Sequence, residues 1–163
     1  MKIKYFICLL LFSFIQVHSQ DTIEEALQKY NKHNVPYLKV GEAIDNKDYL
    51  FLDARKRKEY DVSHIENAIF VGTSKLNSEE MSSLAPDKNA PLIVYCSIGV
   101  RSEKTAQQFL EAGYTNVYNL YGGIFEWVNQ GHPIFDNLGN ETNKVHAFSK
   151  YWGKFLTKGE KVY

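Results

Sequence analysis

Short apolar runs alternate along this chain with stretches of helical character, and this alternation constrains the fold more than any other feature. Tyr49–Asp53 and Pro91–Tyr95 are almost continuously apolar, which is typical of strands buried on both faces. Strands that alternate with helices predict a parallel sheet covered on both faces, within an α/β domain. The other predicted strands are Pro36–Val40, Ala68–Val71 and Asn116–Leu120, and the predicted helices are Asp21–Asn31, Gly41–Asp45, Lys56–Tyr60, Ser78–Leu84, Arg101–Ala112 and Ile124–Asn129.

Length and charge narrow the class of protein further. A chain of 163 residues is long enough for one domain with a substantial hydrophobic core. Its 19 Lys and Arg residues balance its 19 Asp and Glu residues, so the charge gives no indication of nucleic-acid binding. We therefore expect no nucleic-acid partner.

The first residues have the pattern of a secretory signal. Lys2 and Lys4 precede the apolar run Tyr5–Ile15, and small residues follow where a signal peptidase cleaves. A membrane anchor is the alternative, but a spanning helix requires about 20 apolar residues and this run is shorter. We expect residues 1–19 to be removed and the protein to be exported to the periplasm or the extracellular space, without stable membrane insertion afterwards.

Cleavage at that point would leave Cys96 as a lone thiol, because the other cysteine, Cys8, lies inside the apolar run. Disulfides persist in exported proteins, yet this chain could then form no internal bridge. A lone thiol in such a compartment is either buried or used in chemistry. The surroundings of Cys96 therefore decide its role.

Cys96 lies between the strongest predicted strand and a predicted helix, where parallel α/β sheets form their sites. The backbone N–H groups of such a loop and the helix dipole form an anion cradle, which lowers the pKa of a thiol. Gly99 permits the tight turn, and Arg101 adds a fixed positive charge. The loop predicts a nucleophilic Cys96 rather than a structural cysteine, with Ser97, Ile98, Gly99, Val100 and Arg101 as the substrate-binding residues.

Three segments, in order, carry a resemblance to a known family. The first comprises Leu52–Arg55, Glu59-Tyr60 and His64–Ala68, the second is the loop Val94–Ser102, and the third runs from Gly113 to Trp127. Over roughly Val35–Ile134, the chain resembles single-domain rhodanese-like sulfurtransferases. It departs from the family pattern at Ser63 and Asn67, where glycine is usual.

The resemblance implies a five-stranded, mostly parallel sheet flanked by helices. It also implies that a sulfane sulfur passes from thiosulfate or a persulfide to a thiol, cyanide or a protein acceptor through a persulfide on Cys96. The four residues between Cys96 and Arg101 match the six-residue loop of sulfurtransferases, whereas related phosphatases and arsenate reductases have a longer loop.

Polar residues outside the loop allow more than one role in this interpretation. Asp53 and Arg55 end a predicted strand on the same side of the sheet as Cys96, and either shape the pocket or pair with each other to fix loops. His64 is either a base or a structural histidine. The remaining histidines show no metal-ligand spacing, so we expect no metal and no cofactor.

The C-terminal tail has a different character from the rest of the chain. Its apolar residues Val145, Phe148, Trp152, Phe155 and Leu156 fall on one helical face, opposite several lysines. This pattern predicts a helix docked on the domain, and a membrane-surface or partner-binding helix is the alternative. The predicted organisation is a signal peptide at 1–19, a helical segment at 20–34, the rhodanese-like domain at 35–135 and the tail at 136–163.

The leading hypothesis is therefore an exported sulfurtransferase. One alternative is a sulfur carrier or protein-binding module with little turnover of its own. A second alternative is redox sensing, because accessible thiols of low pKa oxidise readily.

Overall fold

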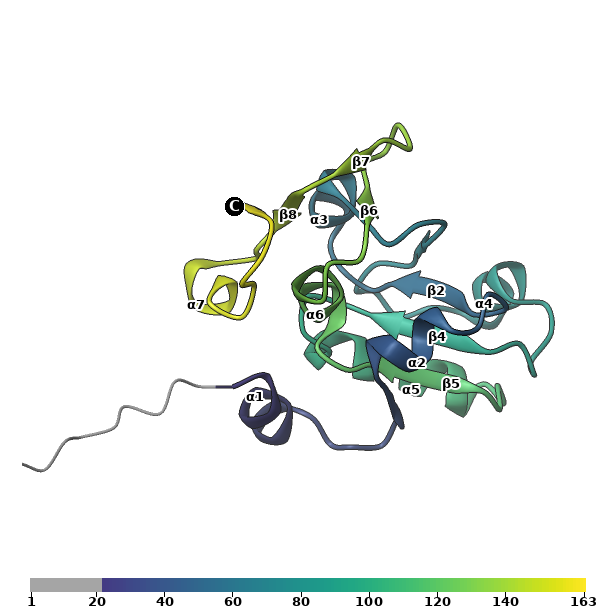
Figure 1. Cartoon of the computed structure of the whole chain (residues 1–163). Coiled ribbons are helices and arrows are strands. Elements are labelled where there is room, and N and C mark those ends of the chain that lie inside the picture. The colour runs from purple at the N-terminus through teal and green to yellow at the C-terminus, as the bar shows by residue number, and fades with distance from the viewer. Residues whose placement is uncertain (1–21) are drawn as a thin grey trace, which may run out of the picture.

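The computed structural model describes residues 22–163, so the predicted signal segment 1–19 lies outside the described residues. Five strands form one parallel sheet in the order β1-β5-β4-β2-β3 (Figure 1). The five-stranded α/β fold expected from the sequence is confirmed. The strands are β1 (Tyr37–Leu38), β2 (Leu50–Asp53), β3 (Ile69–Phe70), β4 (Leu92–Tyr95) and β5 (Val117–Leu120).

Helices cover both faces of this sheet. Alternate residues of β4 face opposite sides, because side chains alternate along a strand. Leu92 and Val94 pack with residues of α4 (Ser78–Leu84) and α5 (Val100–Glu111). Ile93 and Tyr95 pack on the other side with α2 (Val40–Ile44) and α6 (Gly123–Asn129). The two remaining helices before the tail are α1 (Ile23–Tyr30) and α3 (Arg57–Val62).

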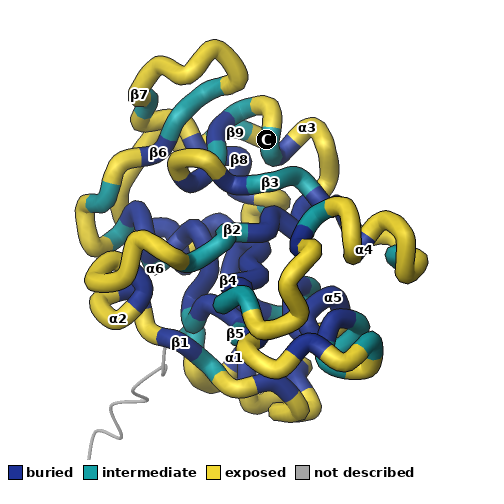
Figure 2. Tube along the Cα trace, turned by 90° about the vertical axis from the view of Figure 1, so that its right-hand side faces the viewer, coloured by how far each residue is buried: buried dark blue, intermediate teal, exposed yellow. Residues whose placement is uncertain are grey.

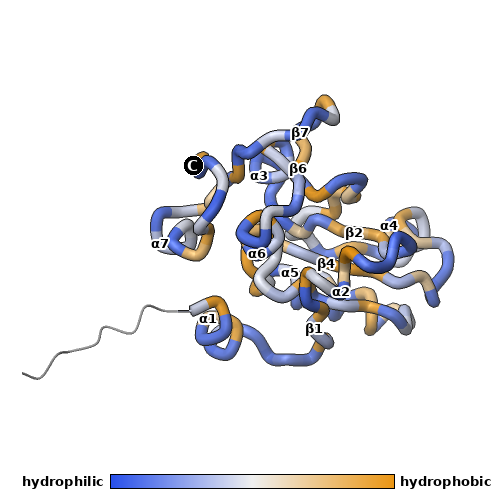
Figure 3. Tube along the Cα trace, viewed as in Figure 1, coloured by the Kyte–Doolittle hydropathy of each residue, from blue (hydrophilic) through white to orange (hydrophobic). Residues whose placement is uncertain are grey.

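The central position of β4 explains its composition. All four of its residues are buried, and it pairs with β2 on one side and β5 on the other. Each fully buried aliphatic side chain contributes roughly 1.5–3 kcal/mol to folding. The centre of the molecule, which includes β4, is buried, and the outer loops are exposed (Figure 2). Hydrophobic residues gather along the central strands (Figure 3). The best-packed strand of the sheet thus leads directly into the Cys96 loop.

Local sequence explains where several helices begin. Thr22 caps α1, where its hydroxyl accepts from the N–H of Glu25 at 3.1 Å and the Glu25 carboxylate accepts from the N–H of Thr22 at 2.8 Å. Asn77 and Glu80 form the same reciprocal cap at α4. Within residues 22–163, no helix combines the length and the apolar character that a membrane crossing requires.

The tail is not the single helix that its pattern predicted, and that expectation is wrong. Only α7 (Lys150–Gly153) is helical, and it lies between β8 (Lys144–His146) and β9 (Glu160–Val162), which pair in parallel. Phe148 at φ 63° and Gly159 at φ 83° bend the chain away from helical geometry on either side of α7. Before them, β6 (Ile134–Phe135) and β7 (Glu141–Thr142) form an antiparallel pair.

The tail nevertheless packs closely on the domain. Val145 and Leu156 are fully buried, and both belong to the apolar cluster on the α2 and α6 face of the sheet. The apolar residues that suggested one face of a helix are instead distributed over β8, the bend at Phe148, α7 and the turn that follows α7. These residues are spaced as they would be on one helical face, but they do not form one helix. Val145 and Leu156 are buried because the tail folds back onto the domain.

Candidate active site

Cys96 follows β4 and precedes α5, at the carboxyl edge of the sheet. Its side chain is buried, and the backbone N–H of Gly99 donates a hydrogen bond to Sγ at 3.2 Å. Gly99 is the N-cap of the 12-residue α5 and has φ 102°, where a side chain would be strained. The sulfur therefore lies at the positive end of a helix dipole, and glycine is needed to place it there.

The surroundings of Cys96 lower the pKa of its thiol. Burial alone would raise the pKa, but the positive charge of Arg101 outweighs it together with hydrogen bonds from Ser102 and the Gly99 N–H. A lowered pKa increases the thiolate fraction near neutral pH, and the thiolate is the nucleophilic form. The nucleophilic role of Cys96 stays a prediction that this lowered pKa supports.

Arg101 is held in place by Glu59, a residue of α3 that the sequence analysis used only for the resemblance. Nη1 of Arg101 donates to Oε2 of Glu59 at 2.7 Å, and Nη2 donates to Oε1 at 2.8 Å. Nη2 also donates to Oγ of Ser97 at 2.9 Å. Burial tends to raise the pKa of Glu59, but its hydrogen bonds with Arg101 and that residue's charge bring it below the ordinary value. Glu59 thus remains ionised and fixes the guanidinium beside the loop.

Two asparagines fix the Gly99 peptide, and the sequence analysis identified neither. Nδ2 of Asn119 donates to the Gly99 carbonyl at 2.8 Å, and Nδ2 of Asn31 donates to the same oxygen at 2.9 Å. Oδ1 of Asn119 accepts from the Ser102 hydroxyl at 2.7 Å. These bonds fix the peptide between Gly99 and Val100, directly after the peptide whose N–H donates to Sγ of Cys96. The available sequence signal was a polar residue, Asn119, inside the apolar run of β5.

The first residues of α6 hold the backbone of the Cys96 loop. The N–H of Ile124 donates to the Cys96 carbonyl at 2.9 Å, and that of Phe125 donates to the Ser97 carbonyl at 3.0 Å. Gly123 has φ 54°, and a Cβ there would collide with the Cys96 carbonyl. Gly122 and Gly123 therefore allow α6 to begin in direct contact with the loop that precedes α5.

A pocket of about 160 Å³ lies over Cys96. Its walls include Ile98 and Val100 from the loop and the first turn of α5, and its roof consists of Phe148 and Trp152 from the tail. Cys96, Ser97 and Arg101 complete the lining. The structure thus brings five of the six predicted loop residues to one pocket, and Gly99 is the one that does not line it. It also adds Phe148 and Trp152, which the sequence pattern placed only on a docking face.

Asp53, Arg55 and His64 lie outside this pocket. Arg55 and Asp53 form a fully buried ion pair at 2.6 Å, and Nη2 of Arg55 also donates to the Ser63 carbonyl at 2.6 Å. His64 stacks on Tyr60 with ring centroids 4.0 Å apart. These contacts fix the segment around α3, which carries Glu59, and none of them reaches the sulfur.

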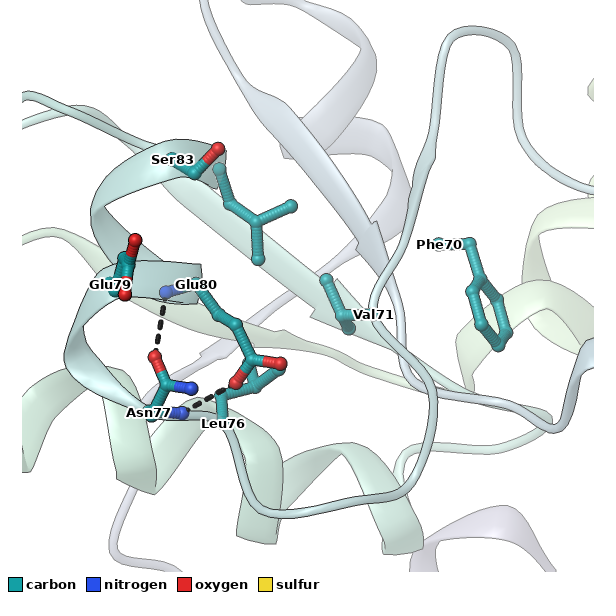
Figure 4. A pocket seen from close by; sticks show the side chains of 8 residues that line it. Phe70, Val71, Leu76, Asn77, Glu79, Glu80 and Ser83 are labelled. Atoms are coloured by element: carbon teal, nitrogen blue, oxygen red, sulfur yellow. Dashed lines mark hydrogen bonds between the residues drawn. The ribbon is translucent and has the colours of Figure 1, made fainter.

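Other hollows on the surface offer less chemistry. Beside α4, Phe70, Val71 and Leu76 line an open pocket together with the polar residues of the helix start (Figure 4). Asn77 and Glu80 are occupied by the reciprocal helix cap drawn there. Among residues 22–163, no three His, Cys, Asp or Glu side chains are grouped to hold a metal ion.

A protein-family comparison agrees with the loop geometry. The model of the Rhodanese-like domain matches residues 36–130, more than half of the chain. The chain belongs to the rhodanese-like domain family. The match ends before the tail, so Phe148 and Trp152 are additions to the rhodanese-like domain.

Curated relatives share this domain within longer proteins. The chain is 38% identical over 108 residues to the tRNA uridine(34) hydroxylase of Yersinia pestis, covering 60% of this chain and 30% of that protein. The hydroxylase of the same name from Photorhabdus laumondii is 39% identical over 110 residues, with coverages of 60% and 31%. The chain therefore spans less than a third of the length of these relatives.

Solved structures show the same rhodanese-like fold. The BH2092 protein from Bacillus halodurans superposes with a TM-score of 0.56 and 26% identity, over 71% of this chain and 88% of that one. A thiosulfate sulfurtransferase from Pseudomonas aeruginosa gives a TM-score of 0.55 and 28% identity, over 75% of this chain and 23% of that one.

Proposed function

We propose that the protein is a sulfurtransferase that carries a sulfane sulfur on Cys96. The observation that carries this proposal is a buried cysteine whose sulfur faces the Gly99 N–H and whose pKa is lowered by Arg101. Such a thiolate attacks sulfur electrophiles, and the same loop can stabilise the anionic persulfide that results.

The transfer takes two steps that balance in atoms and electrons. The Cys96 thiolate attacks the outer sulfur of thiosulfate or of a persulfide R–S–SH. The donor S–S bond breaks as the Cys96 S–S bond forms, so sulfite or R–S⁻ leaves. An acceptor thiolate, or cyanide, then attacks the outer sulfur and releases the Cys96 thiolate. No external oxidant or reductant is consumed, and Cys96 returns to its starting state.

Sulfur transfer, rather than the reaction for which the curated relatives are named, is our proposal for this chain. The tRNA uridine(34) hydroxylases are more than three times the length of the matched region. The balanced charge of this chain offers no excess of cations for a phosphate backbone. Absence of tRNA binding at low salt would agree with this, and tight salt-dependent binding would contradict it.

The test is direct detection of sulfur on Cys96. After incubation with thiosulfate or an organic persulfide, we expect the intact mass to rise by one sulfur atom and to fall again when cyanide or a thiol is added. Cys96→Ser is the control and should acquire no sulfur and produce no thiocyanate. Normal thiocyanate production by Cys96→Ser would overturn the proposal.

The roof over Cys96 favours a second candidate, a sulfur carrier that exchanges with one protein partner and turns over slowly with small donors. Cys96 is only 1% exposed beneath Phe148 and Trp152, which limits access. A loaded persulfide that survives small thiols but passes rapidly to a co-purifying protein would support this candidate. Rapid multiple turnover with small molecules would contradict it.

Export is a separate part of the proposal and rests on residues 1–19, with their basic start and apolar run. We expect the full chain, expressed in a bacterium, to appear outside the cytoplasm with a new N-terminus near residue 20. Retention in the cytoplasm with residues 1–19 intact would contradict export and leave the sulfur chemistry unaffected.

A further inference from the structure

The pocket over Cys96 is unusually apolar for a site that would receive a small inorganic anion. Four of its seven lining residues, Ile98, Val100, Phe148 and Trp152, present apolar side chains. Two of these belong to the tail, outside the region that defines the family. The tail therefore adds apolar surface over Cys96 that the matched domain alone lacks.

Contacts with the domain and within the tail hold both roof residues. The ring centroid of Phe148 lies 4.7 Å from Cζ of Arg101, and the Phe148 N–H donates to Nδ1 of His146 at 3.1 Å. Trp152 packs edge-on against Tyr30 of α1, with centroids 5.5 Å apart. Preformed apolar surface binds apolar groups without an ordering cost.

The lining of the pocket offers a dianion no unpaired cation. Arg101 supplies the one cationic side chain in the lining, and Glu59 neutralises it through two hydrogen bonds of 2.7 and 2.8 Å. With Cys96 ionised, this group of three carries a net charge of −1. Thiosulfate would lose its hydration among apolar walls and meet a net negative charge, and both effects oppose its entry.

The volume defines the size of the group that fits. A dry apolar cavity of about 150 Å³ accommodates a benzene molecule. The pocket over Cys96 has a volume of about 160 Å³, so it has room for one phenyl ring or a short branched alkyl group.

We infer that the physiological donor or acceptor is a small organic thiol, or its persulfide, with an apolar group of about the size of a phenyl ring. This inference rests on the proposed function and names its substrate class. In the acceptor step, R–S⁻ attacks the outer sulfur of the protonated Cys96 persulfide, and the S–S bond to Cys96 breaks as the new S–S bond forms. R–S–SH leaves with the proton of the outer sulfur, Cys96 remains as the thiolate, and the apolar R group occupies the space beneath Phe148 and Trp152.

Two acceptors of matched geometry test this inference. 2-Phenylethanethiol and 2-mercaptoethanesulfonate each carry a thiol on a two-carbon chain, and differ in a phenyl group against a sulfonate. Both are added to protein that already carries the Cys96 persulfide, and each unloading rate is divided by the rate of the same thiol with a small soluble persulfide. The corrected ratio is the resulting value for the phenyl compound divided by that for the sulfonate. We expect the corrected ratio to favour the phenyl compound by about tenfold or more.

Variants of the roof assign the preference to its residues. Trp152→Ala and Phe148→Ala should each move the corrected ratio toward one, while Trp152→Phe should retain most of it. Leu138→Ala, a tail residue that is 86% exposed and outside the pocket, is the matched control and should leave the ratio unchanged. The wild-type ratio itself is decisive even where a roof variant fails to fold.

The outcomes separate this inference from the proposed function. A corrected ratio near one in the wild-type protein, with Cys96 loaded, overturns the apolar substrate class and leaves sulfur transfer standing. A full preference that persists in both roof alanine variants also overturns it. Failure of any donor to place sulfur on Cys96 overturns the proposed function.

Discussion

Arg101 and Glu59 form a bidentate ion pair at the edge of the Cys96 pocket, with the Glu59 side chain fully buried and that of Arg101 25% exposed. The pair joins α3 to the first turn of α5, so two parts of the chain 42 residues apart meet beside one sulfur atom. Glu59 determines where the guanidinium lies, and the guanidinium lowers the pKa of Cys96. The two acidic groups, a carboxylate and a thiolate, thus share one cation.

Replacing Arg101 should therefore affect both stability and reactivity. In Arg101→Met, Glu59 is left buried without its cation, which we expect to cost about 3–5 kcal/mol of unfolding free energy. The pKa of Cys96 should rise because its main favourable charge is gone. Urea denaturation measures the stability, and the pH dependence of alkylation by iodoacetamide measures the thiol pKa.

Arg57→Met is the matched control for this prediction. Arg57 also forms an ion pair, with Asp61 at 2.7 Å, but their side chains are 64% and 38% exposed. Exposed pairs contribute about 0–1 kcal/mol. A similar effect of both substitutions on the Cys96 alkylation profile would contradict the role assigned to Arg101.

Asn119 should matter for reactivity although it does not line the pocket. Asn119→Leu removes the donor to the Gly99 carbonyl and the acceptor of the Ser102 hydroxyl. We expect a loss of about 1–3 kcal/mol of unfolding free energy and a higher Cys96 pKa, because the loop peptides are no longer held in place. Asn116→Ala, an exposed asparagine whose amide donates to Asn89, should change neither quantity appreciably. Unaltered alkylation in Asn119→Leu would show that the loop holds its own shape.

The sheet and the Cys96 loop could be predicted because their signals are local. A buried strand such as β4 is visible as an apolar run, and the glycine of a helix start is visible in the loop itself. Glu59 and Asn119 could not be placed in the same way, because their partners lie 42 and 20 residues away. Only the three-dimensional pairing shows that these polar residues act on the loop.

The tail shows how a periodic pattern can mislead. The apolar spacing at Val145, Phe148 and Leu156 suits one helical face, yet β8 and β9 pair instead and only four residues between them are helical. Strand pairing and the bend at Phe148 are tertiary effects that outweigh weak helix propensity. Because the sequence pattern predicts the wrong fold for the tail, it cannot predict the position of Phe148 and Trp152 over Cys96.

Gly123 should tolerate no side chain. In Gly123→Ala, the new Cβ would collide with the Cys96 carbonyl and with Ser97 main-chain atoms, in addition to the strain of φ 54°. Gly139→Ala is the matched control, since Gly139 has φ 77° but nothing within 4 Å of the added atom. We expect about 1–2 kcal/mol of destabilisation from the conformation alone at Gly139, and clearly more at Gly123, in urea denaturation. Equal losses would show that α6 can move away from the loop.

His146 should make the tail sensitive to acid. Its Nδ1 accepts from the Phe148 N–H at 3.1 Å, so the neutral ring carries its proton on Nε2, which is buried without a partner. Burial lowers the pKa of His146, assisted by the positive charge of Lys58. Protonation would place a proton on Nδ1, break the bond to Phe148 and loosen the roof over Cys96.

The sign of the pH effect follows from this lowered pKa. As the pH falls, the unfolded chain takes up a proton on His146 near pH 6.5, before the folded protein does. The contribution of neutral His146 to stability is therefore complete above about pH 6.5 and is lost as the pH falls through the lower pKa of the folded protein. Urea denaturation between roughly pH 8 and pH 5 should show this loss. His146→Gln should lessen the slope, and His132→Gln, a change outside the tail, should preserve it. Because protonation of His146 in the folded protein would break its bond to Phe148, alkylation of Cys96, corrected for its own ionisation, should accelerate in the wild-type protein as the pH falls through the lowered pKa of His146. An unchanged slope in His146→Gln would assign the acid sensitivity to another group.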